Sequence, residues 1–514
     1  MSDVAISIKQ AGIYPRKAFP AVAFWCLIAA LLINLFCNSF SPFFIPEGAM
    51  DPNCFYAEGC AISQGYLPYR DFIDVKGPLL FLIYTIGYLM SPTQCYGIFL
   101  IYVLTTWGTL IAFYRTAELF GLSRRCAVFA TALAVCCLFS KYTAYWAAQP
   151  EHFLVLPLSW TFYYLTAFLK HPEATFLRPL AWWLGSGATC AFLIKFNFVL
   201  PYVAVFALAV FVLARQQRLK DIVFFVIRCA AAFILICIPF ALYFFYHGLW
   251  GDFYHAYVTL NLEANLNQPQ IEWGRKFSNR DIRLSYLVLG HAVVRASYRQ
   301  SAVISKTLMR YLLVVIPATF FSSFIGMHGY YYILMAPAAI FLCIDAAGSK
   351  AAENFLQRRF LIKSALFALI FIFVINAFCI SHMGWRRPAG SAAQIAKVQE
   401  MIARIPSPKI IYYSTADILL GRKAASLPGT PAWMSLSQVK TIYVQRDIDV
   451  MGKKADFIVT QDDVPEETLQ LLQAAGYESI PQAQIPKVNK FISNVQVWAQ
   501  PQTMRRCTEN AVND

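Results

Sequence analysis

Charged residues are scarce in this chain. Only 14% of its 514 residues are Asp, Glu, Lys or Arg, whereas 58% are apolar or aromatic, and the mean hydropathy is +0.51. Soluble globular domains contain roughly 25% charged residues and roughly 45–50% apolar ones. Apolar runs of roughly 20 residues, the length that crosses a bilayer, recur along most of the chain. The composition therefore excludes a large soluble protein with buried helices and predicts an integral membrane protein.

The chain also lacks any Cys-x-x-Cys pair, although it contains 14 cysteines. Without that spacing, the cysteines do not predict a zinc site. Most of them, such as Cys136 and Cys237, lie inside apolar runs and are interpreted as small core residues. Cys54 and Cys60 share one polar segment, where two free thiols are favoured over a short disulfide. Internal repeats and low-complexity tracts are absent from the sequence as well.

The net charge of +15 does not indicate a nucleic-acid partner. The basic residues lie in short clusters between apolar runs, which is the pattern of cytoplasmic loops in membrane proteins. Such clusters can also contact anionic lipid. They are Lys9/Arg16/Lys17, Arg124/Arg125, Arg215/Arg218/Lys220 and Lys350/Arg358/Arg359/Lys363.

The apolar runs predict an α-helical polytopic protein with about 11 transmembrane helices. The segment 284–298 is only weakly apolar, and it is included because otherwise the last two basic loops would change sides. The short run 79–91 is expected to lie along the interface or to re-enter the bilayer. The first run is too long for a typical signal-peptide core, so we expect an uncleaved helix and a cytoplasmic N-terminus. The expected spans are 20–40, 94–118, 126–140, 152–169, 179–194, 196–214, 221–246, 284–298, 307–326, 330–347 and 362–381.

The composition becomes polar after Ser381. Apolar residues with period two at 410–413, 442–444 and 457–459 predict strands, and the pattern at 465–476 predicts a helix. We therefore expect two domains, a multi-spanning domain at 1–384 and a small α/β domain at 385–514 on the periplasmic side.

The segment 41–78, which follows the first span and is expected to be periplasmic, is dense in acids, aromatics and turn residues. Asp51 is expected near the lipid headgroups, where a carboxylate can act as a general base. A helix N-cap or a solvated acid is the alternative. Lys76 precedes Gly77-Pro78 at an expected helix start, where a lysine and the helix amides would both favour a phosphate. Snorkelling of Lys76 to the interface is the alternative.

Polar residues also occur at the ends of later spans. Glu151 follows Gln149-Pro150 and is a candidate second acid, although an acid in a first helical turn is a common structural feature. Lys195 interrupts a long apolar stretch. It is interpreted either as a second phosphate contact or as part of an ordinary turn. His328 precedes three tyrosines and is a candidate phosphate or metal ligand, or part of an aromatic belt. Asp74, Glu151 and His328 have suitable ligand atoms for a divalent metal, but no spacing requires one.

The order of these motifs resembles the polyprenyl-phosphate-dependent glycosyltransferases of the GT-C superfamily. Within it, the chain is most similar to the protein O-mannosyltransferases and the bacterial aminoarabinose transferases of lipid A. The likeness covers roughly the first 350 residues in order. It rests on Asp51, Tyr56-Ala57-Glu58, Gly65-Tyr66-Leu67-Pro68-Tyr69, Asp71, Asp74-Val75-Lys76-Gly77-Pro78-Leu79, Gln149-Pro150-Glu151, Gly185 to Asn197, His328-Gly329-Tyr330-Tyr331 and Pro337.

The resemblance implies a GT-C-like enzyme of the bacterial inner membrane. It would move a sugar, with inversion, from a polyprenyl-phosphate-sugar donor to a lipid, glycan or protein acceptor on the periplasmic side. A divalent metal is the one cofactor considered. An arginine that the family often has upstream of its His-Tyr turn is missing here. A lipid-linked glycan flippase or polymerase, or another polytopic transporter, is the alternative function.

Roles follow from the resemblance together with the residue chemistry. Asp51 and Glu151 are the expected catalytic acids. The expected donor phosphate ligands are Lys76, Lys195 and His328. The expected acceptor-side residues are Glu58, Tyr69, Asp71, Asp74, Tyr330 and Tyr331.

Overall fold

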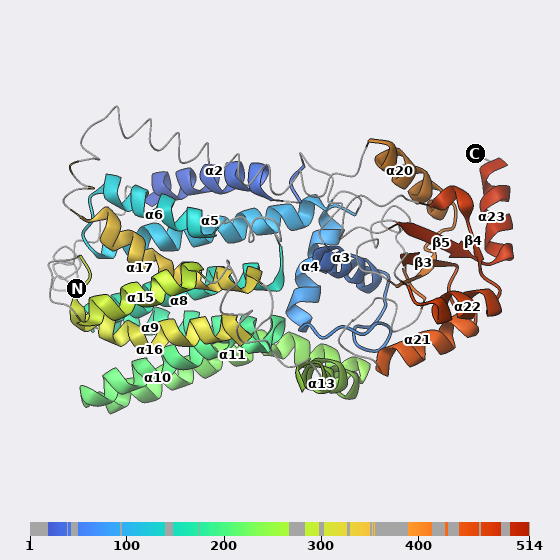
Figure 1. The fold of residues 1–514 in the computed structure, drawn as a ribbon. Coiled ribbons are helices and arrows are strands. Elements are labelled where there is room, and N and C mark those ends of the chain that lie inside the picture. Colours follow the sequence, from blue (N-terminus) through green and yellow to red (C-terminus); the bar gives the residue numbers. More distant parts are fainter. Residues whose placement is uncertain are drawn as a thin grey trace. The chain divides into compact units, whose positions relative to one another are not determined.

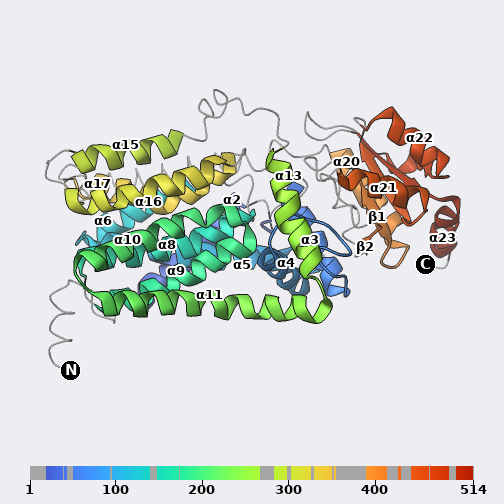
Figure 2. The same cartoon turned by 90° about the horizontal axis from the view of Figure 1, so that it is seen from below.

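The chain forms two compact units that interleave along the sequence (Figures 1 and 2). The helical unit comprises Met1–Asn38, Tyr102–Ala241 and Glu272–Ile380, and the mixed unit comprises Ser39–Ile101, Leu242–Ile271 and Ser381–Asp514. The computed structural model describes residues 19–38, 40–42, 50–92, 95–138, 148–172, 174–266, 283–297, 303–325, 329–349, 352, 354, 389–413, 427–429, 441–461, 464–484 and 494–512.

The helical unit consists of helices at the predicted apolar runs. Of the helices that the structure describes, six are long and apolar enough to cross a membrane, which supports a multi-pass membrane protein. Other predicted spans coincide with shorter or less apolar helices, and the predicted span 362–381 lies outside the described residues. The elements are α2 (Phe19–Cys37), α5 (Tyr96–Leu119), α6 (Arg124–Leu138), α8 (Pro150–Lys170), α9 (Ala174–Ile194), η2 (Phe196–Phe198), α10 (Leu200–Arg215), α11 (Leu219–His247), α15 (Arg283–Ser297), α16 (Lys306–Ile325), η5 (Gly329–Met335) and α17 (Ala336–Ala347).

Small residues allow helices of this unit to approach closely. A Cβ atom on Gly185 of α9 would lie 2.4 Å from the carbonyl oxygen of Cys229 in α11, and one on Gly187 would lie 2.3 Å from the Tyr202 ring in α10. Such close approach is the usual basis of helix association in lipid, where van der Waals packing replaces the hydrophobic effect.

A buried ionic cluster explains why 284–298 is only weakly apolar. His291 and Arg295 of α15 both contact Asp345 of α17, at 2.9 Å from His291 Nε2 and 2.8 Å from Arg295 Nε to Asp345 Oδ2. The three side chains are only 11–13% exposed. Helix α15 therefore packs in the helical unit through polar contacts that its hydropathy alone does not reveal.

The mixed unit begins with a helix inside the segment 41–78. Helix α3 (Met50–Ser63) packs against α4 (Pro78–Met90). The contact is close because a Cβ on Gly59 would lie 2.7 Å from the Tyr84 carbonyl group. Cys54 and Cys60, on α3, are buried free thiols, as predicted. Helix α4 has 13 residues, about 20 Å, which is shorter than the roughly 30 Å hydrocarbon core.

The rest of this unit holds short helices after α11 and a five-stranded sheet of order β2-β1-β3-β5-β4. Strands β2, β1 and β3 are parallel, and β5 is antiparallel to β3 and β4. The core around the sheet includes Ile411, Ile458, Leu472 and Trp498. The elements are α12 (Trp250–Phe253), η3 (Tyr254–Thr259), α13 (Leu260–Leu266), α20 (Ala389–Ala403), β1 (Lys409–Tyr412), β2 (Leu427–Pro428), α21 (Thr441–Met451), β3 (Phe457–Gln461), α22 (Glu466–Ala474), β4 (Glu478–Ser479), η7 (Pro481–Ala483), β5 (Val495–Ala499) and α23 (Pro501–Val512).

One predicted strand of this region is wrong. Residues 442–444 belong to helix α21 (Thr441–Met451) rather than to a strand. The buried side chains that follow are Arg446, Asp449 and Val450, at spacings of three and four, which place them on one face of a helix. A period-two pattern over only three residues is a weaker predictor of structure than this helical spacing. The strands predicted at 410–413 and 457–459 and the helix at 465–476 coincide with β1, β3 and α22.

Candidate functional site

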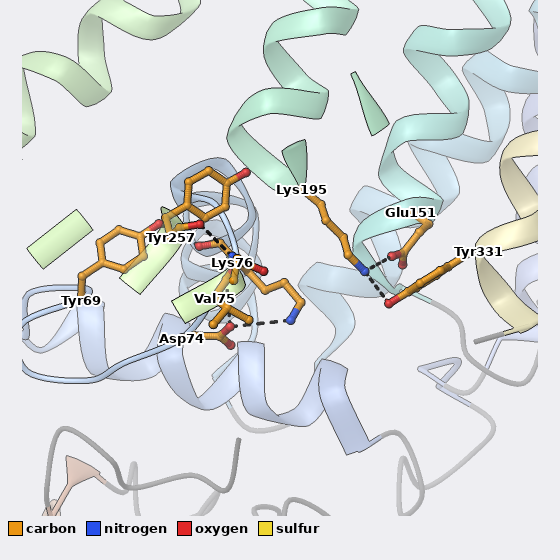
Figure 3. Close-up of polar contacts among 9 residues, drawn as sticks. Tyr69, Asp74, Val75, Lys76, Glu151, Lys195, Tyr257 and Tyr331 are labelled. Atoms are coloured by element: carbon orange, nitrogen blue, oxygen red, sulfur yellow. Dashed lines mark hydrogen bonds and ion pairs between the residues drawn. The ribbon is translucent and has the colours of Figure 1, made fainter. Parts of the chain in front are cut away.

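The first candidate cluster lies in the mixed unit where the chain passes from α3 to α4 (Figure 3). We call Glu58, Tyr69, Asp74 and Lys76 the Lys76 cluster. Helix α4 begins directly after it, with Gly77 as N-cap and Pro78 in the first turn. A proline fits that turn because its fixed φ suits the helix and it has no N–H to leave unsatisfied. Lys76 therefore lies at a helix start, as the sequence predicts.

The Asp74 carboxylate fixes the backbone of Lys76. Asp74 Oδ1 accepts a hydrogen bond of 2.9 Å from the Lys76 backbone N–H and lies 3.7 Å from Lys76 Nζ. The side chains are only 6% and 19% exposed, respectively. Lys76 Nζ also lies 5.8 Å from the centre of the Phe55 ring, within the range of a cation–π contact. The ammonium group is thus partly shielded from solvent and oriented by two neighbours.

Two further side chains hold the segment before Lys76 in place. The Tyr69 hydroxyl donates a hydrogen bond of 2.8 Å to the Lys76 carbonyl oxygen, and the Asn261 amide donates one of 2.7 Å to the Val75 carbonyl oxygen. Tyr69 is buried and has a φ of 69°, a left-handed conformation that non-glycine residues rarely adopt. Its ring packs against Phe81 and Phe253. These contacts specify one backbone path for the lysine.

The Glu58 carboxyl group is fully buried in α3 beside Asp74. Among the described residues, the Glu58 carboxyl oxygens have no hydrogen-bond partner other than the Asp74 carboxyl group. Burial raises the pKa of Glu58 well above its ordinary value, and the negative charge of Asp74 raises it further. The protonated form of Glu58 is therefore favoured over a wider pH range than that of an exposed glutamate.

Asp51 and Asp71 occupy different local settings. Asp51 lies in the first turn of α3, where the helix dipole favours a carboxylate. Asp71 Oδ2 accepts a hydrogen bond of 2.6 Å from the Leu67 backbone N–H, so its carboxylate closes a turn of the segment. Asp71 is thus already used in holding the loop.

The second candidate cluster lies in the helical unit and comprises Glu151, Lys195 and Tyr331 (Figure 3). We call it the Lys195 cluster. Lys195 Nζ lies 2.7 Å from Glu151 Oε1 and 2.6 Å from the Tyr331 hydroxyl oxygen. Its ammonium also lies 3.8 Å from the centre of the Tyr331 ring. Glu151 is fully buried, and the Lys195 side chain is 16% exposed.

Local structure explains how these three residues meet. Lys195 stands in extended conformation between α9 and the short 3₁₀ turn η2, so the predicted bend is present. Glu151 lies in the first turn of α8, after Pro150. Tyr331 lies in the 3₁₀ segment η5. An ammonium group has three N–H donors, so the lysine retains one donor beyond the two contacts made to Glu151 and Tyr331.

Two buried polar atoms beside this cluster have no hydrogen-bond partner in the described part of the chain. They are Glu151 Oε2 and His152 Nε2. Nδ1 of His152 accepts a hydrogen bond of 3.2 Å from the Gln149 backbone N–H, which leaves Nε2 as the protonated nitrogen when the ring is neutral. Unsatisfied buried polar atoms are rare in native proteins, and a catalytic role or a bound water or ion is among their explanations. Sequence reasoning missed His152, because a histidine in a first helical turn carries no signal of its own.

The remaining predicted residues are only partly described. His328 lies outside the described residues, and for Tyr330 only the backbone is described. Within the described ranges, no group of three or more His, Cys, Asp or Glu side chains is arranged to hold a metal ion. Sequence reasoning also missed Phe55 and Asn261, which contact the lysine segment from helices whose pairing the sequence does not reveal.

Comparison with solved structures identifies the class of fold. The fold is of the class that the sequence resemblance predicted. Its fold matches that of ArnT from Cupriavidus metallidurans bound to undecaprenyl phosphate, with a TM-score of 0.60 over 95% of this chain and 99% of that one, at 12% identity. At this identity the likeness shows the fold alone.

Weaker similarities were also found. ArnT from the same organism in its apo state has a TM-score of 0.47 at 12% identity, covering 95% of this chain and 99% of that one. The oligosaccharyltransferase of Archaeoglobus fulgidus, in complex with Zn and sulfate, has a TM-score of 0.43 at 14% identity, covering 88% and 71%. No protein-family model matches the chain, and no curated protein matches it.

Proposed function

We propose that this protein is a membrane glycosyltransferase that uses a polyprenyl-phosphate-sugar donor. The observation that carries the proposal is the shared fold over 95% of the chain with a protein solved with undecaprenyl phosphate bound. The Lys76 cluster supports it, because it presents a shielded lysine at the start of a helix, a setting that favours a phosphate. The sugar and the acceptor, whether lipid, glycan or protein, are left open.

The reaction would proceed by direct displacement at the anomeric carbon. Asp51 would accept the proton of the acceptor hydroxyl or amine as that atom forms its bond to the anomeric carbon. The bond from the anomeric carbon to the phosphate oxygen would break at the same time, and the electron pair would leave with the phosphate. Attack from the opposite face inverts the configuration. The Lys76 ammonium would stabilise the negative charge that develops on the leaving phosphate.

The Lys195 cluster is proposed to contribute the second phosphate contact. Lys195 would use its remaining N–H for the phosphate, while Glu151 and Tyr331 hold its ammonium in place. Glu58 and Asp74 would set the charge around Lys76, and Tyr69 would fix its backbone. By analogy with the predicted topology, the reaction would take place at the periplasmic face of a bacterial inner membrane, with the 385–514 domain on that side.

A divalent metal is a further proposal for charge neutralisation. The Glu58 and Asp74 carboxyl groups are oxygen ligands of the type that Mg²⁺ or Mn²⁺ takes. Bound there, a cation would supply positive charge toward the phosphate. Transfer measured with and without a chelator, with added Mg²⁺ as the control, tests this requirement.

The central test is transfer of sugar from a synthetic polyprenyl-phosphate-sugar by the purified protein in liposomes. General-base catalysis contributes roughly 100-fold to 10,000-fold, so Asp51→Asn should lower kcat at least about 100-fold while donor binding is retained. The matched control is Glu466→Gln, which neutralises an exposed acid on α22 and should leave transfer unchanged. Movement of labelled lipid across vesicles without sugar transfer would instead show a flippase and refute the proposal.

A double-mutant cycle tests whether the two lysines bind the same ligand. Lys76→Gln and Lys195→Gln should each weaken donor binding, measured with a non-transferable donor phosphonate. If both lysines contact one phosphate, the loss in the double variant should be smaller than the sum of the single losses, with a coupling of roughly 0.5–3 kcal/mol. Strict additivity would remove one lysine from the phosphate site.

A further inference from the structure

A second lipid-binding feature lies in the helical unit. An elongated cavity of about 500 Å³ runs between α2, α5 and α6, and its lining is almost entirely apolar. It is bordered by Trp25 and Leu32 of α2, Leu110 of α5 and Val128 of α6. Trp25 is 61% exposed and Leu32 49%, so the cavity opens as a groove at the surface. The three helices lie side by side in Figure 1.

The walls of this groove are held together by specific contacts. The Trp107 indole N–H donates a hydrogen bond of 2.7 Å to the Ala23 carbonyl oxygen, and the Asn34 amide donates one of 3.1 Å to the Thr106 hydroxyl oxygen. These bonds fix α2 against α5 at residues 106–107, which precede the α5 residues that line the groove. The groove is therefore a built feature of the helical unit rather than a chance gap.

One end of the groove is positively charged. Arg124, in the first turn of α6, is its one charged lining residue, and Arg125 follows it. Both arginines are exposed, and no acidic side chain in the described ranges forms an ion pair with either. Cations at a helix N-terminus are disfavoured by the helix dipole. A bound anion would relieve this repulsion.

The length of the groove fits a lipid chain of one leaflet. Its lining extends along α6 from Arg124 to Cys136, about 18 Å at 1.5 Å per residue. Half of a hydrocarbon core is about 15 Å. A diacyl phospholipid would thus place its phosphate at the arginines and an acyl chain along the groove, whereas a polyprenyl chain of many isoprene units would extend well beyond it.

The groove also differs in position from the Lys195 cluster. The Lys170 ammonium, at the last residue of α8, contacts the Leu119 carbonyl oxygen at the end of α5. The charged end of the groove is therefore near the C-terminal end of α8. Glu151 lies in the first turn of the same helix, about 28 Å away along the helix axis.

We infer that the groove between α2, α5 and α6 binds an anionic diacyl phospholipid, with the phosphate at Arg124 and Arg125 and an acyl chain against Trp25 and Val128. This site lies beyond the proposed sugar-transfer site and does not depend on it. Its role would be to anchor α2 to the rest of the helical unit in the leaflet on the Arg124 side.

Native mass spectrometry of the purified protein tests this inference. The protein is delipidated in detergent and incubated with equal amounts of phosphatidylglycerol and phosphatidylcholine that carry identical acyl chains. Wild type should retain phosphatidylglycerol preferentially. Arg124→Gln/Arg125→Gln should lower its retention roughly 25-fold, since each basic residue contributes a factor of about five. Arg215→Gln, which neutralises an exposed arginine at the end of α10, is the matched control.

A second pair of variants tests the apolar part of the site. Ala132→Trp fills the groove and should abolish retention of both lipids, whereas Val203→Trp, at a 54% exposed position of α10, should not. Intrinsic fluorescence gives a further measurement on a groove that has not been filled. Phosphatidylglycerol with brominated chains should quench the fluorescence of wild type, and the quenching should decrease in Trp25→Phe because Trp25 lines the groove. Equal retention of the two lipids by wild type, unchanged retention in Ala132→Trp, or release of bound polyprenyl phosphate by Ala132→Trp would each overturn the assignment.

Discussion

The buried pair of Glu151 and Lys195 allows structural and functional roles to be separated. Glu151 is fully buried and Lys195 nearly so. Removal of one partner leaves an unpaired charge in a poorly hydrated environment, which typically costs about 3–5 kcal/mol. Replacement of both by apolar residues of similar volume is often close to neutral. We therefore expect Glu151→Leu and Lys195→Met each to destabilise the protein more than the double variant Glu151→Leu/Lys195→Met does.

The expected shifts are large enough to measure. For a unit of roughly 250 residues, 1 kcal/mol corresponds to about 2 °C in the unfolding midpoint. Each single variant should therefore unfold roughly 6–10 °C below wild type in detergent, as followed by intrinsic fluorescence. The double variant should recover most of this loss. Tyr331→Phe, which removes one hydrogen bond to the ammonium, should lie between wild type and the single variants.

Sugar transfer should follow a different order from stability. If Lys195 contacts the donor phosphate, the double variant stays as inactive as Lys195→Met although its stability is restored. A double variant that is less stable than both single variants would refute the argument that the pair is buried and mutually compensating. Recovery of transfer together with stability would show that the pair is purely structural.

Three further predictions concern other contacts. The Glu58 carboxyl group holds its proton more tightly in the folded protein than in the unfolded chain, so wild-type stability should fall as the pH rises above about 4.5. Glu58→Gln should therefore have a higher unfolding midpoint than wild type at pH 8 and the same midpoint near pH 4. Gly59→Ala should lower the free energy of unfolding by about 1–3 kcal/mol, because its Cβ would overlap the Tyr84 carbonyl group. Gly251→Ala, whose Cβ would meet no atom within 4 Å, should be neutral. Thermal unfolding compares the two variants. Asp345→Asn should cost about 3–5 kcal/mol, measured in the same way, because its buried arginine partner loses its counter-charge.

The helices of the membrane region were predictable because each hydrophobic run sums a weak signal over many residues. The expected run 221–246, for example, is α11 (Leu219–His247). The segment 442–444 failed because three residues are too few to distinguish a strand from one turn of a helix. Helix α3 was not foreseen, because its burial comes from the close contact of Gly59 with α4 rather than from a hydrophobic pattern of its own.

Contacts within the candidate site are harder to predict from sequence than the helices are. The bend at Lys195 was visible as one lysine in an apolar stretch. Its partners Glu151 and Tyr331 are 44 and 136 positions away in the sequence, and no local pattern links them. The same holds for Asn261, which contacts the Val75 carbonyl oxygen across 186 positions. Sequence reasoning could propose the individual residues, whereas only the fold shows which of them meet.

The two lysines differ in a way that bears on their proposed roles. Lys195 Nζ lies 2.7 Å from its carboxylate, at hydrogen-bond distance, whereas Lys76 Nζ lies 3.7 Å from that of Asp74. Asp74 instead accepts the backbone N–H of Lys76. An incoming phosphate therefore competes with a weaker counter-charge at Lys76 than at Lys195. We therefore propose that Lys76 supplies most of the charge that would stabilise the leaving phosphate.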